Sequence, residues 1–282
     1  MDVDRLHSDI FRGGSKTYYG ASRLFPKAVR RDVFVLYAFV RVADNLVDDQ
    51  PVFPEEFRAF RQRWRTAWAG TPAHDAVIDP FVELARRKGF DPQWVEDFLT
   101  TMETDLEARP LDTLDDVLRY TWGSAEVIGL FMIRLLGIPD EAKTTACLMG
   151  RSMQFINFLR DIAEDHALGR RYLPLGDSGL ESLTPGEAAA NPDRFRTFLR
   201  GQTAYYTRWQ TEAREGYAWL PWRFRLAIKT ASDLYNWTAR VIQDDPMVVW
   251  KRKVKPSQAR ILFTALGNLF YFPPRPRPRR AA

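Results

Sequence analysis

Acidic and amide side chains recur every four residues in one stretch of the chain, QFINFLRDIAEDHALGRRYLP at 154–174. Asn157, Asp161 and Asp165 lie at positions i, i+4 and i+8, and Gln154 precedes them by one turn. Residues four apart lie on one face of an α-helix, so the spacing predicts a single polar row. Apolar residues flank this row, and charge buried there without a partner is costly. Divalent metal cations are the expected compensation.

A second row of the same kind ends the apolar stretch DVFVLYAFVRVADNLVDD at 32–49. Its carboxylates, Asp44 and Asp48, again lie four residues apart. Proteins usually hold Mg²⁺ through one or two carboxylates, while water and phosphate oxygens complete its octahedral shell. Two facing rows therefore predict a site for a diphosphate bridged by Mg²⁺ ions. The alternative is that each row is a solvated helix face with spare charge, which is the commoner role of charged runs.

The composition limits the classes of protein that fit. The chain has 282 residues, 45% of them hydrophobic, enough for one large domain or two small ones. No apolar run approaches a membrane-spanning length, the N-terminus has no apolar signal segment, and the single cysteine, Cys147, allows no internal disulfide. We therefore expect a cytoplasmic protein. A net charge of +5 fits nucleic acid, an anionic membrane or a small anionic substrate; we expect no nucleic acid, because no motif that binds it is present.

Helical periodicity runs through most of the chain, and few stretches alternate as strands do. It predicts one all-α domain over residues 1–272. The tail 273–282, PPRPRPRRAA, is predicted to be basic and disordered. Because the apolar run 269–272 precedes it, this end of the chain could rest on an anionic membrane. The predicted helices cover residues 26–49, 55–70, 75–89, 92–106, 120–136, 141–165, 195–219, 221–243 and 260–272.

Two motifs resemble those of a known family. DNLVD at 44–48 resembles the first aspartate-rich motif, DxxxD, of the squalene and phytoene synthases, and NFLRDIAEDHALGRRYLP at 157–174 resembles their second, NxxRDxxEDxxxGRxYxP. Further similarity runs from Gly14 to Ser257. The resemblance implies the isoprenoid synthase fold, a single helical bundle around a central cavity. One difference is Asn45, which stands where many relatives carry a second acid.

The resemblance implies Mg²⁺ or Mn²⁺ as the cofactor and prenyl diphosphates as the substrates. The metal ligands would be Asp44, Asp48, Asn157, Asp161 and Asp165, and the four aspartates would be catalytic. Tyr120, Tyr235 and released diphosphate are alternatives for the final proton acceptor. Further side chains are expected to bind the diphosphates or the substrate chain: Ser15, Lys16, Tyr18, Arg41, Gln154, Asn157, Arg160, Arg171, Tyr172 and Lys253.

Small residues in YTWGSAEVIGLFMIRLL, 120–136, allow two interpretations. Glycine inside a helix costs about 1 kcal/mol relative to alanine, so its presence needs a reason. Either a neighbouring helix packs closely, or a long isoprenoid chain runs alongside. The resemblance favours a substrate tunnel lined by Ser124, Ala125 and Gly129, with Glu126 facing outward.

Two further sets of charged residues, one basic and one acidic, lie near positions that belong to the active site in the family. Lys251, Arg252 and Lys253 belong to a segment that resembles a family region closing over phosphate. The sequence leaves open which of the three does so, and a surface cluster is the alternative. Glu103 and Asp105 lie near an acidic position of the family and are expected only to support the site.

The resemblance implies head-to-head (1'-1) condensation of two prenyl diphosphates through a cyclopropylcarbinyl diphosphate. The wording GSAEVIG and the chain length favour prokaryotic phytoene synthases, which join two geranylgeranyl diphosphates in the first step of carotenoid biosynthesis without NADPH. One alternative is a C30 product from farnesyl diphosphate, either squalene, which needs NADPH, or dehydrosqualene. Alternatives from other classes are a non-catalytic relative acting as a binding or assembly protein, and a basic membrane-surface or nucleic-acid protein. We expect a cytoplasmic location, with peripheral contact at the inner face of the membrane.

Overall fold

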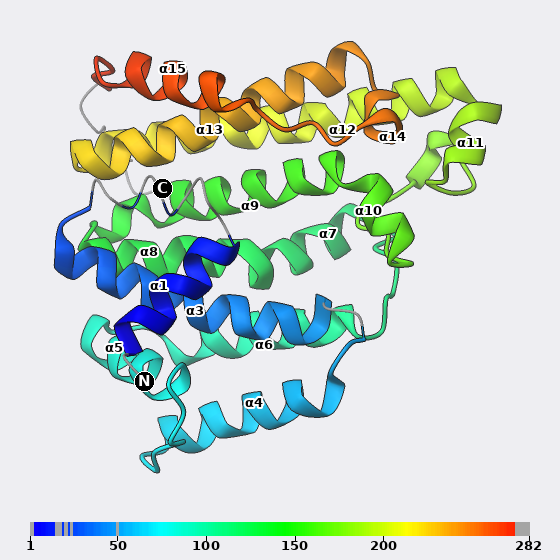
Figure 1. Ribbon diagram of the computed structural model, residues 1–282. Coiled ribbons are helices and arrows are strands. Elements are labelled where there is room, and N and C mark those ends of the chain that lie inside the picture. Colours follow the sequence, from blue (N-terminus) through cyan, green and yellow to red (C-terminus); the bar gives the residue numbers. More distant parts are fainter. Residues whose placement is uncertain (1–2, 15–18, 20–21, 23–24, 49–50, 274–282) are drawn as a thin grey trace. The chain divides into compact units, whose positions relative to one another are not determined.

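A computed structural model describes residues 3–14, 19, 22, 25–48 and 51–273 (Figure 1). Every regular element in these ranges is a helix, so the all-α prediction is confirmed. None of these helices combines the length and the apolar content that crossing a bilayer requires. Contacts divide the chain into two compact units, residues 1–107 with 131–138, and residues 108–130 with 139–282. The predicted boundary between a domain and a tail at residue 272 stays a prediction.

The described part of the first unit contains five complete helices and the last part of α8 (Val127–Leu136), residues 131–136, and local signals set several of the helix ends. Asp91 caps one helix by accepting a hydrogen bond from the Gln93 backbone at 2.9 Å, and Pro92 occupies the first helical position. Gly89 ends the preceding helix in the left-handed conformation, at φ 65°. The helices are α1 (Val3–Gly14), α3 (Lys27–Asp48), α4 (Pro54–Trp68), α5 (Ile78–Lys88) and α6 (Pro92–Asp105).

Aromatic packing holds α3 in the first unit. Phe39 of α3 stacks on Phe81 of α5 with ring centroids 3.8 Å apart, and it also contacts Phe60 of α4. The N-terminal part of α3 is fixed by charge, because the buried Asp32 pairs with Arg87 at 2.7 Å. Helix α3 is therefore held along its length, which gives the acidic residues at its end a defined position.

The second unit is built around α9, which packs against α12, while α13 lies on α12 and α15 lies on α13 (Figure 1). Its α-helices are α7 (Leu114–Thr121), the first part of α8 (Val127–Leu136), α9 (Lys143–Arg160), α10 (Ile162–Ala167), α11 (Pro185–Ala190), α12 (Pro192–Ala213), α13 (Trp222–Asp244), α14 (Val248–Lys251) and α15 (Gln258–Asn268). Short 3-10 turns cover Asp140–Ala142, Gly176–Ser178 and Arg214–Trp219.

Two predicted helices of this unit are interrupted. The stretch predicted as one helix over 120–136 contains a π-helical turn, Trp122–Glu126, between α7 and α8. The helix predicted over 141–165 breaks at Asp161, whose φ of −101° and ψ of 16° are not helical. Single π-helical turns inside α-helices occur frequently at functional sites. Both interruptions fall in segments that the sequence marked as chemically important.

Glu126 corrects one expectation. We expected this side chain to face outward, but it is only 3% exposed. Arg151 of α9 donates two hydrogen bonds to its carboxylate, at 2.7 and 3.1 Å. The bidentate geometry compensates the buried charge, and it ties the π-helical turn to α9.

Close helix packing accounts for Gly129. A Cβ atom at this position would lie 2.5 Å from the backbone oxygen of Ala146 on α9, closer than real contacts allow. Gly150 of α9 meets the Ala125 backbone oxygen in the same way. Close packing against α9 therefore explains the glycine at 129, and its predicted place in the wall of a substrate tunnel stays a prediction.

The tight contact predicts the effect of adding one methyl group. Gly129→Ala should lower the free energy of unfolding by about 1 to 3 kcal/mol, because the backbones of α8 and α9 must separate. Gly201→Ala in α12 is the matched control: nothing lies within 4 Å of its added Cβ, so alanine should stabilise the helix by up to about 1 kcal/mol. Urea unfolding followed by circular dichroism measures both. Equal shifts would contradict the proposed packing.

Candidate functional site

The acidic row of the first unit lies on the last two turns of α3. Arg41 donates a hydrogen bond to Asp44 at 2.5 Å, and the Asp44 side chain is 30% exposed. Asp48 lies one turn further on, at the C-terminal end of α3. Arg41, predicted to bind a diphosphate, thus forms a direct ion pair with Asp44, and its contact with a diphosphate stays a prediction.

Two further groups adjoin this row. Burial, reinforced by repulsion from Asp48 and less strongly from Asp105, raises the pKa of Asp44 to about 6, although Arg41 opposes the shift. Burial also raises the pKa of Tyr37, with Arg41 opposing and Asp44 adding to the effect. Asp105, expected only as support, thus brings a third carboxylate from α6 close to Asp44 in this unit.

Tyr37 is a neighbour that sequence reasoning missed. Its spacing could have identified it, because positions 37, 41, 44 and 48 share one helical face. A Cβ on Gly14 would collide with the Tyr37 hydroxyl, so the end of α1 passes directly over this ring. Ser15, Lys16 and Tyr18 follow Gly14 in the sequence but lie outside the described residues, and their predicted roles stay predictions.

The acidic row of the second unit spans the break between α9 and α10. Asp161 and Asp165 remain one turn apart, since the Asp165 backbone donates to the Asp161 carbonyl at 2.8 Å. The Asn157 Oδ1 atom is buried and has no hydrogen-bond partner, while its Nδ2 donates to Gln154 at 3.4 Å. A buried oxygen without a partner is costly, and a bound cation would satisfy it.

Cations already surround Asp161. Arg160 donates two hydrogen bonds to the Asp161 carboxylate, one of them at 2.8 Å, and Lys253 lies 3.0 Å from the same group. Burial opposes the charged form of Arg160, but its hydrogen bond and attraction to Asp161, with a smaller contribution from Tyr235, raise its pKa. Tyr235 of α13 therefore lies beside Arg160, and its predicted role as a proton acceptor stays a prediction.

Lys253 and Lys251 have different partners. It pairs with both Asp161 and Glu164, whereas Lys251 pairs with Asp245 at 2.9 Å and is 64% exposed. Of the three candidate cations, Lys253 is the one whose contact with the acidic row is observed. Its contact with a diphosphate stays a prediction.

Aromatic rings adjoin the same end of α9. Tyr172 stacks on Phe158 with ring centroids 4.6 Å apart, and Tyr120 lies 5.0 Å from Tyr172 and 5.7 Å from Phe158. The three rings come from α7, α9 and the loop after α10. They form one aromatic cluster at the core of the second unit, in which Tyr120 is almost fully buried.

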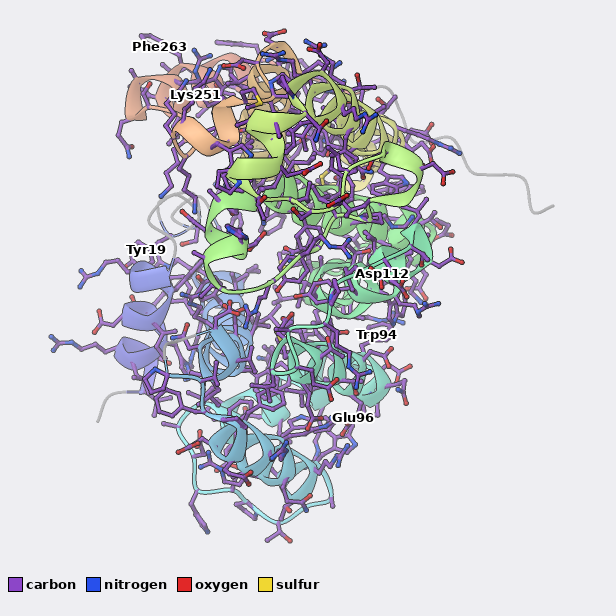
Figure 2. The ribbon with its side chains drawn as sticks, turned by 90° about the vertical axis from the view of Figure 1, so that its right-hand side faces the viewer. Tyr19, Trp94, Glu96, Asp112, Lys251 and Phe263 are labelled. Carbon is purple, nitrogen blue, oxygen red and sulfur yellow. The ribbon has the colours of Figure 1, made fainter. Side chains whose placement is uncertain are left out.

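Arg171 and Ser124 are two further positions that were predicted to bind the substrate. Arg171 donates to the backbone oxygens of Leu111 and Leu173, each at 3.0 Å, and to Asp112 at 2.5 Å. Asp112 is labelled in Figure 2. These contacts tie two loops together and do not join Arg171 to the acidic row. The Ser124 hydroxyl in the π-helical turn is buried without a hydrogen-bond partner, so it remains free to accept or donate one.

The residues of each row fit a hydrated Mg²⁺ ion. In the described part of the chain, no three His, Cys, Asp or Glu side chains form a complete metal cage. Mg²⁺ does not require one, because it keeps several waters and is held by one or two carboxylates with phosphate oxygens. Asp44 with Asp48, and Asp161 with Asp165 and the unsatisfied Asn157 oxygen, each provide such a partial ligand set.

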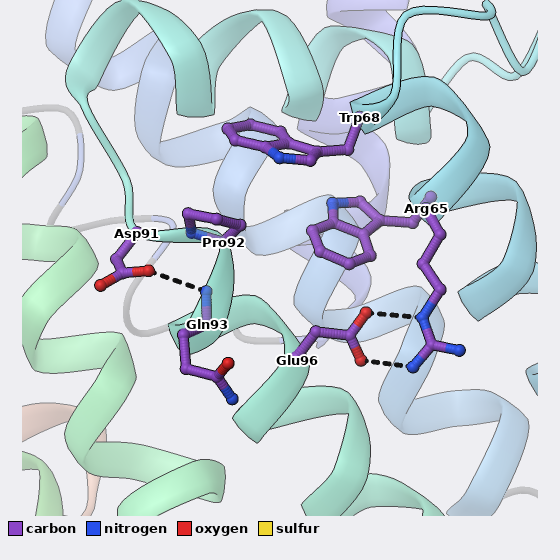
Figure 3. A pocket seen from close by; sticks show the side chains of 7 residues that line it. Arg65, Trp68, Asp91, Pro92, Gln93 and Glu96 are labelled. Atoms are coloured by element: carbon purple, nitrogen blue, oxygen red, sulfur yellow. Dashed lines mark hydrogen bonds and ion pairs between the residues drawn. The ribbon is translucent and has the colours of Figure 1, made fainter.

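A separate pocket of about 430 Å³ lies between α4 and α6 in the first unit (Figure 3). Trp64, Trp68 and Pro92 line it, and the ion pair of Arg65 with Glu96, at 2.7 and 2.8 Å, forms one side. It contains none of the predicted site residues. The pocket is open to solvent, and its lining gives no indication that the pocket takes part in the chemistry of the acidic rows.

Comparison with known proteins identifies close relatives. The model of a family described as squalene/phytoene synthase matches residues 11–260. A 15-cis-phytoene synthase from Pantoea ananas is 30% identical over 95% of this chain and 93% of its own length. A second, from Paracoccus sp. (strain N81106 / MBIC 01143), is 32% identical over 92% of this chain and 88% of its own.

Solved structures agree with the observed architecture. A dehydrosqualene synthase in complex with a ligand is similar with a TM-score of 0.82 at 21% identity, covering 94% of this chain and 95% of that one. A squalene synthase from Alicyclobacillus acidocaldarius gives 0.75 at 20% identity, covering 86% and 93%. At this level of identity the likeness confirms the predicted isoprenoid synthase fold and nothing finer.

The raised pKa of Asp44 predicts a pH dependence of stability. The native carboxyl binds its proton more tightly than the unfolded one, so its contribution to stability is complete below about pH 4 and is lost as pH rises through about 6. In metal-free buffer at pH 7.5, Asp44→Asn should therefore raise the melting temperature, because it increases the free energy of unfolding by at most about 3 kcal/mol. At pH 4 the melting temperature should stay nearly unchanged. Glu83→Gln, on an exposed face of α5, is the control and should change neither. A destabilised Asp44→Asn at pH 7.5 would contradict the prediction.

Proposed function

The chain belongs to the squalene/phytoene synthase family and is a prenyltransferase, and we propose that it joins two geranylgeranyl diphosphates head to head (1'-1) to form phytoene. The observation that carries this proposal is the likeness to 15-cis-phytoene synthases over more than nine-tenths of the chain. The site agrees with it, because both aspartate rows are present and each already places an arginine against a carboxylate. Phytoene formation is the first step of carotenoid biosynthesis, as the resemblance implies.

The proposed cofactor is Mg²⁺ or Mn²⁺. Asp44 and Asp48 would provide ligands from the first unit, and Asn157, Asp161 and Asp165 would provide them from the second. When bound, the metal supplies Lewis-acid withdrawal of negative charge from a leaving diphosphate. The buried Asn157 oxygen, which lacks a partner, is the observation that supports a cation at the second row.

The chain's own cations are proposed to bind the diphosphate oxygens. Arg41, Arg160 and Lys253 now contact carboxylates, and phosphate oxygens offer the same charge-assisted hydrogen bonds, bidentate for arginine. Lys16, with Ser15 and Tyr18, is proposed to cover a diphosphate from the segment after α1. These groups hold the leaving group in place while charge accumulates on it.

The aromatic cluster of Tyr120, Phe158 and Tyr172 is proposed to exclude water during the reaction. Loss of one diphosphate gives an allylic cation, which the double bond of the second molecule attacks; loss of a proton from the resulting cation closes the ring of a cyclopropylcarbinyl diphosphate. A second ionisation and rearrangement follow, and loss of a proton gives phytoene. The faces of Tyr120 and Tyr172 can stabilise such cations electrostatically and keep water from quenching them. Tyr120, Tyr235 and the released diphosphate are the proposed alternatives for the proton acceptor.

A C30 product is the second candidate. The solved relatives include dehydrosqualene and squalene synthases, which share this fold. Farnesyl diphosphate would need the same acidic rows and a shorter space for its chain. A non-catalytic role is disfavoured by the four aspartates at 44, 48, 161 and 165, because a relative that only binds partners would have no reason to keep them all. We also propose peripheral membrane contact at the C-terminal end of the chain.

Separate incubations with C15 and C20 prenyl diphosphates test the proposed reaction. We expect a C40 hydrocarbon from geranylgeranyl diphosphate with Mg²⁺ and without NADPH, detected by mass analysis of the extract, and none after chelation of the metal. A C30 product would correct the substrate, and its hydrogen count would show whether NADPH was used. Asp161→Ala should abolish turnover in the same assay. No hydrocarbon under any condition would reject the enzyme proposal.

The contacts of Lys253 predict a contrast with Lys251. Lys253→Ala should lower kcat/KM on the order of a hundredfold, because a charge-assisted contact to the diphosphate is worth roughly 2 to 3 kcal/mol. Lys251→Ala, which loses only an exposed pair with Asp245, should stay close to the parent enzyme. Steady-state kinetics measure both variants, and circular dichroism checks that both are folded. Equal activity would remove Lys253 from the site.

A further inference from the structure

Glu126 and Arg151 form a buried ion pair to which the proposed reaction assigns no role. The Glu126 side chain is 3% exposed and the Arg151 side chain 23%. The guanidinium donates to both carboxylate oxygens, at 2.7 and 3.1 Å. Apolar side chains of similar volume often replace such a pair without loss of stability, so stability does not explain its presence. The alternative explanation is that the pair fixes one particular conformation.

That conformation is the π-helical turn over residues 122–126. The backbone N–H of Val127 donates to the carbonyl of Trp122, five residues back, where an α-helix would use the carbonyl four residues back. The wider turn aligns Glu126 with Thr121, whose hydroxyl donates to the carboxylate at 3.5 Å. Each residue of an α-helix rotates the chain by about 100°, so a regular turn would point this carboxylate away from its guanidinium partner. The ion pair therefore favours the π-helical turn over a regular one.

A backbone contact presses the same turn against α9. A Cβ on Gly150 would lie 2.3 Å from the backbone oxygen of Ala125. Side chains cannot interlock as ridges and grooves where two backbones touch, so another interaction must fix the register. Glu126 and Arg151 directly follow these two residues in the sequence, and their ion pair adjoins the contact. The pair therefore supplies the fixed register that packing does not.

The turn carries a hydroxyl group without a protein partner. The Oγ atom of Ser124 is buried and makes no hydrogen bond. Leaving a buried polar atom unpaired costs free energy, which a bound ligand or its charge can offset. Ser124 lies two residues before Glu126, so any rotation of the turn would redirect its hydroxyl. The direction of this hydroxyl is therefore coupled to the ion pair.

Arg151 also connects the turn to the aromatic cluster. Its guanidinium lies over the Trp209 ring at 5.4 Å, and Trp209 meets Phe155 edge-on with ring centroids 5.1 Å apart. Phe155 contacts Phe158, a member of the cluster, at 6.2 Å. Tyr120, another member, lies just before the turn in the sequence. The ion pair is thus joined to the cluster both along the chain and through ring contacts.

We propose that Glu126 and Arg151 are positioning residues of the prenyltransferase, and that they act through Ser124. Their ion pair holds the π-helical turn so that the hydroxyl oxygen faces the positive charge that develops on the allylic carbons. A polar group fixed in advance toward such a charge stabilises the transition state without reorganising. The inference rests on the proposed function, because it requires the turn to lie along a prenyl chain.

The position of Arg151 on α9 separates this role from diphosphate binding. It lies ten residues before Asp161, which corresponds to about 15 Å along the helix axis. In this proposal neither charge of the pair contacts a diphosphate, and neither residue takes part in a bond-making step. Loss of the pair should therefore lower kcat and leave the affinity for inorganic diphosphate unchanged.

An apolar replacement separates positioning from stability. Glu126→Leu with Arg151→Met removes the pair without leaving a buried charge, so the melting temperature should stay close to that of the parent. The kcat on the preferred prenyl diphosphate should nevertheless fall on the order of tenfold. Calorimetry with Mg²⁺ should give the parent's dissociation constant for inorganic diphosphate. An unchanged kcat in this folded variant would overturn the proposal.

A double-mutant cycle tests whether the pair acts through Ser124. Ser124→Ala should lower kcat by a similar factor, and adding the apolar replacement of the pair should cause less than about threefold further loss. Losses that multiply independently would contradict the proposal. Arg65→Met is the matched control, since it breaks another bidentate pair, with Glu96 in the first unit, and should keep the parent's kcat.

Hydrogen exchange measures the turn itself and needs no substrate. In the apolar double variant, backbone amides in peptides covering 120–130 should exchange on the order of tenfold faster than in the parent. Unchanged exchange would overturn the proposal even if kcat fell. A parent with no activity on C15 or C20 diphosphates would overturn the proposed function together with this role. An active parent whose kcat survives loss of the pair would overturn only the role of the pair.

Discussion

Compensation of carboxylates on apolar helices is the constraint on which this protein depends. Asp44, Asp48, Asp161 and Asp165 lie at the ends of helices whose other faces are packed with phenylalanine, leucine and isoleucine. A carboxylate in such surroundings must keep its proton, pair with a cation or bind a metal. Asp44 tends to keep its proton, as its raised pKa shows. Asp161 instead pairs with the cations Arg160 and Lys253. A diphosphate with Mg²⁺ would exchange these internal partners for external ones.

Periodicity predicted most of the helices, because an apolar stripe every three or four residues is typical of a helix that packs one face against a core. The interruptions were not predictable in the same way. Neither the π-helical turn at 122–126 nor the break at Asp161 leaves a mark on the spacing of apolar residues. Glu126 illustrates the cause: its burial depends on Arg151, twenty-five positions away in sequence. Local sequence cannot reveal a partner that only tertiary packing supplies.

The same limit applies to the site. The aspartates were identified by spacing, and Tyr37 could have been found on the same face of α3. The choice of Lys253 over Lys251, and the engagement of Arg171 with Asp112, depend on which loop lies opposite each cation. Gly129 shows the difficulty: a small residue can be required either by a neighbouring backbone or by a bound ligand. The approach of the Ala146 backbone decides this case, and no spacing rule could.

At the C-terminal end of the described chain, charged and apolar side chains are arranged in the opposite way to those of the acidic rows. In the rows, charge is surrounded by apolar side chains and finds its partners inside the fold. On α15, apolar side chains lie on the surface, while polar and cation–π contacts fasten the helix to α13. A helix rotated to bury its phenylalanines would lose the contacts of Asn268 and Arg260, and it would turn these polar groups toward no partner. The orientation of the exposed face is therefore specified by the contacts that α15 makes with α13.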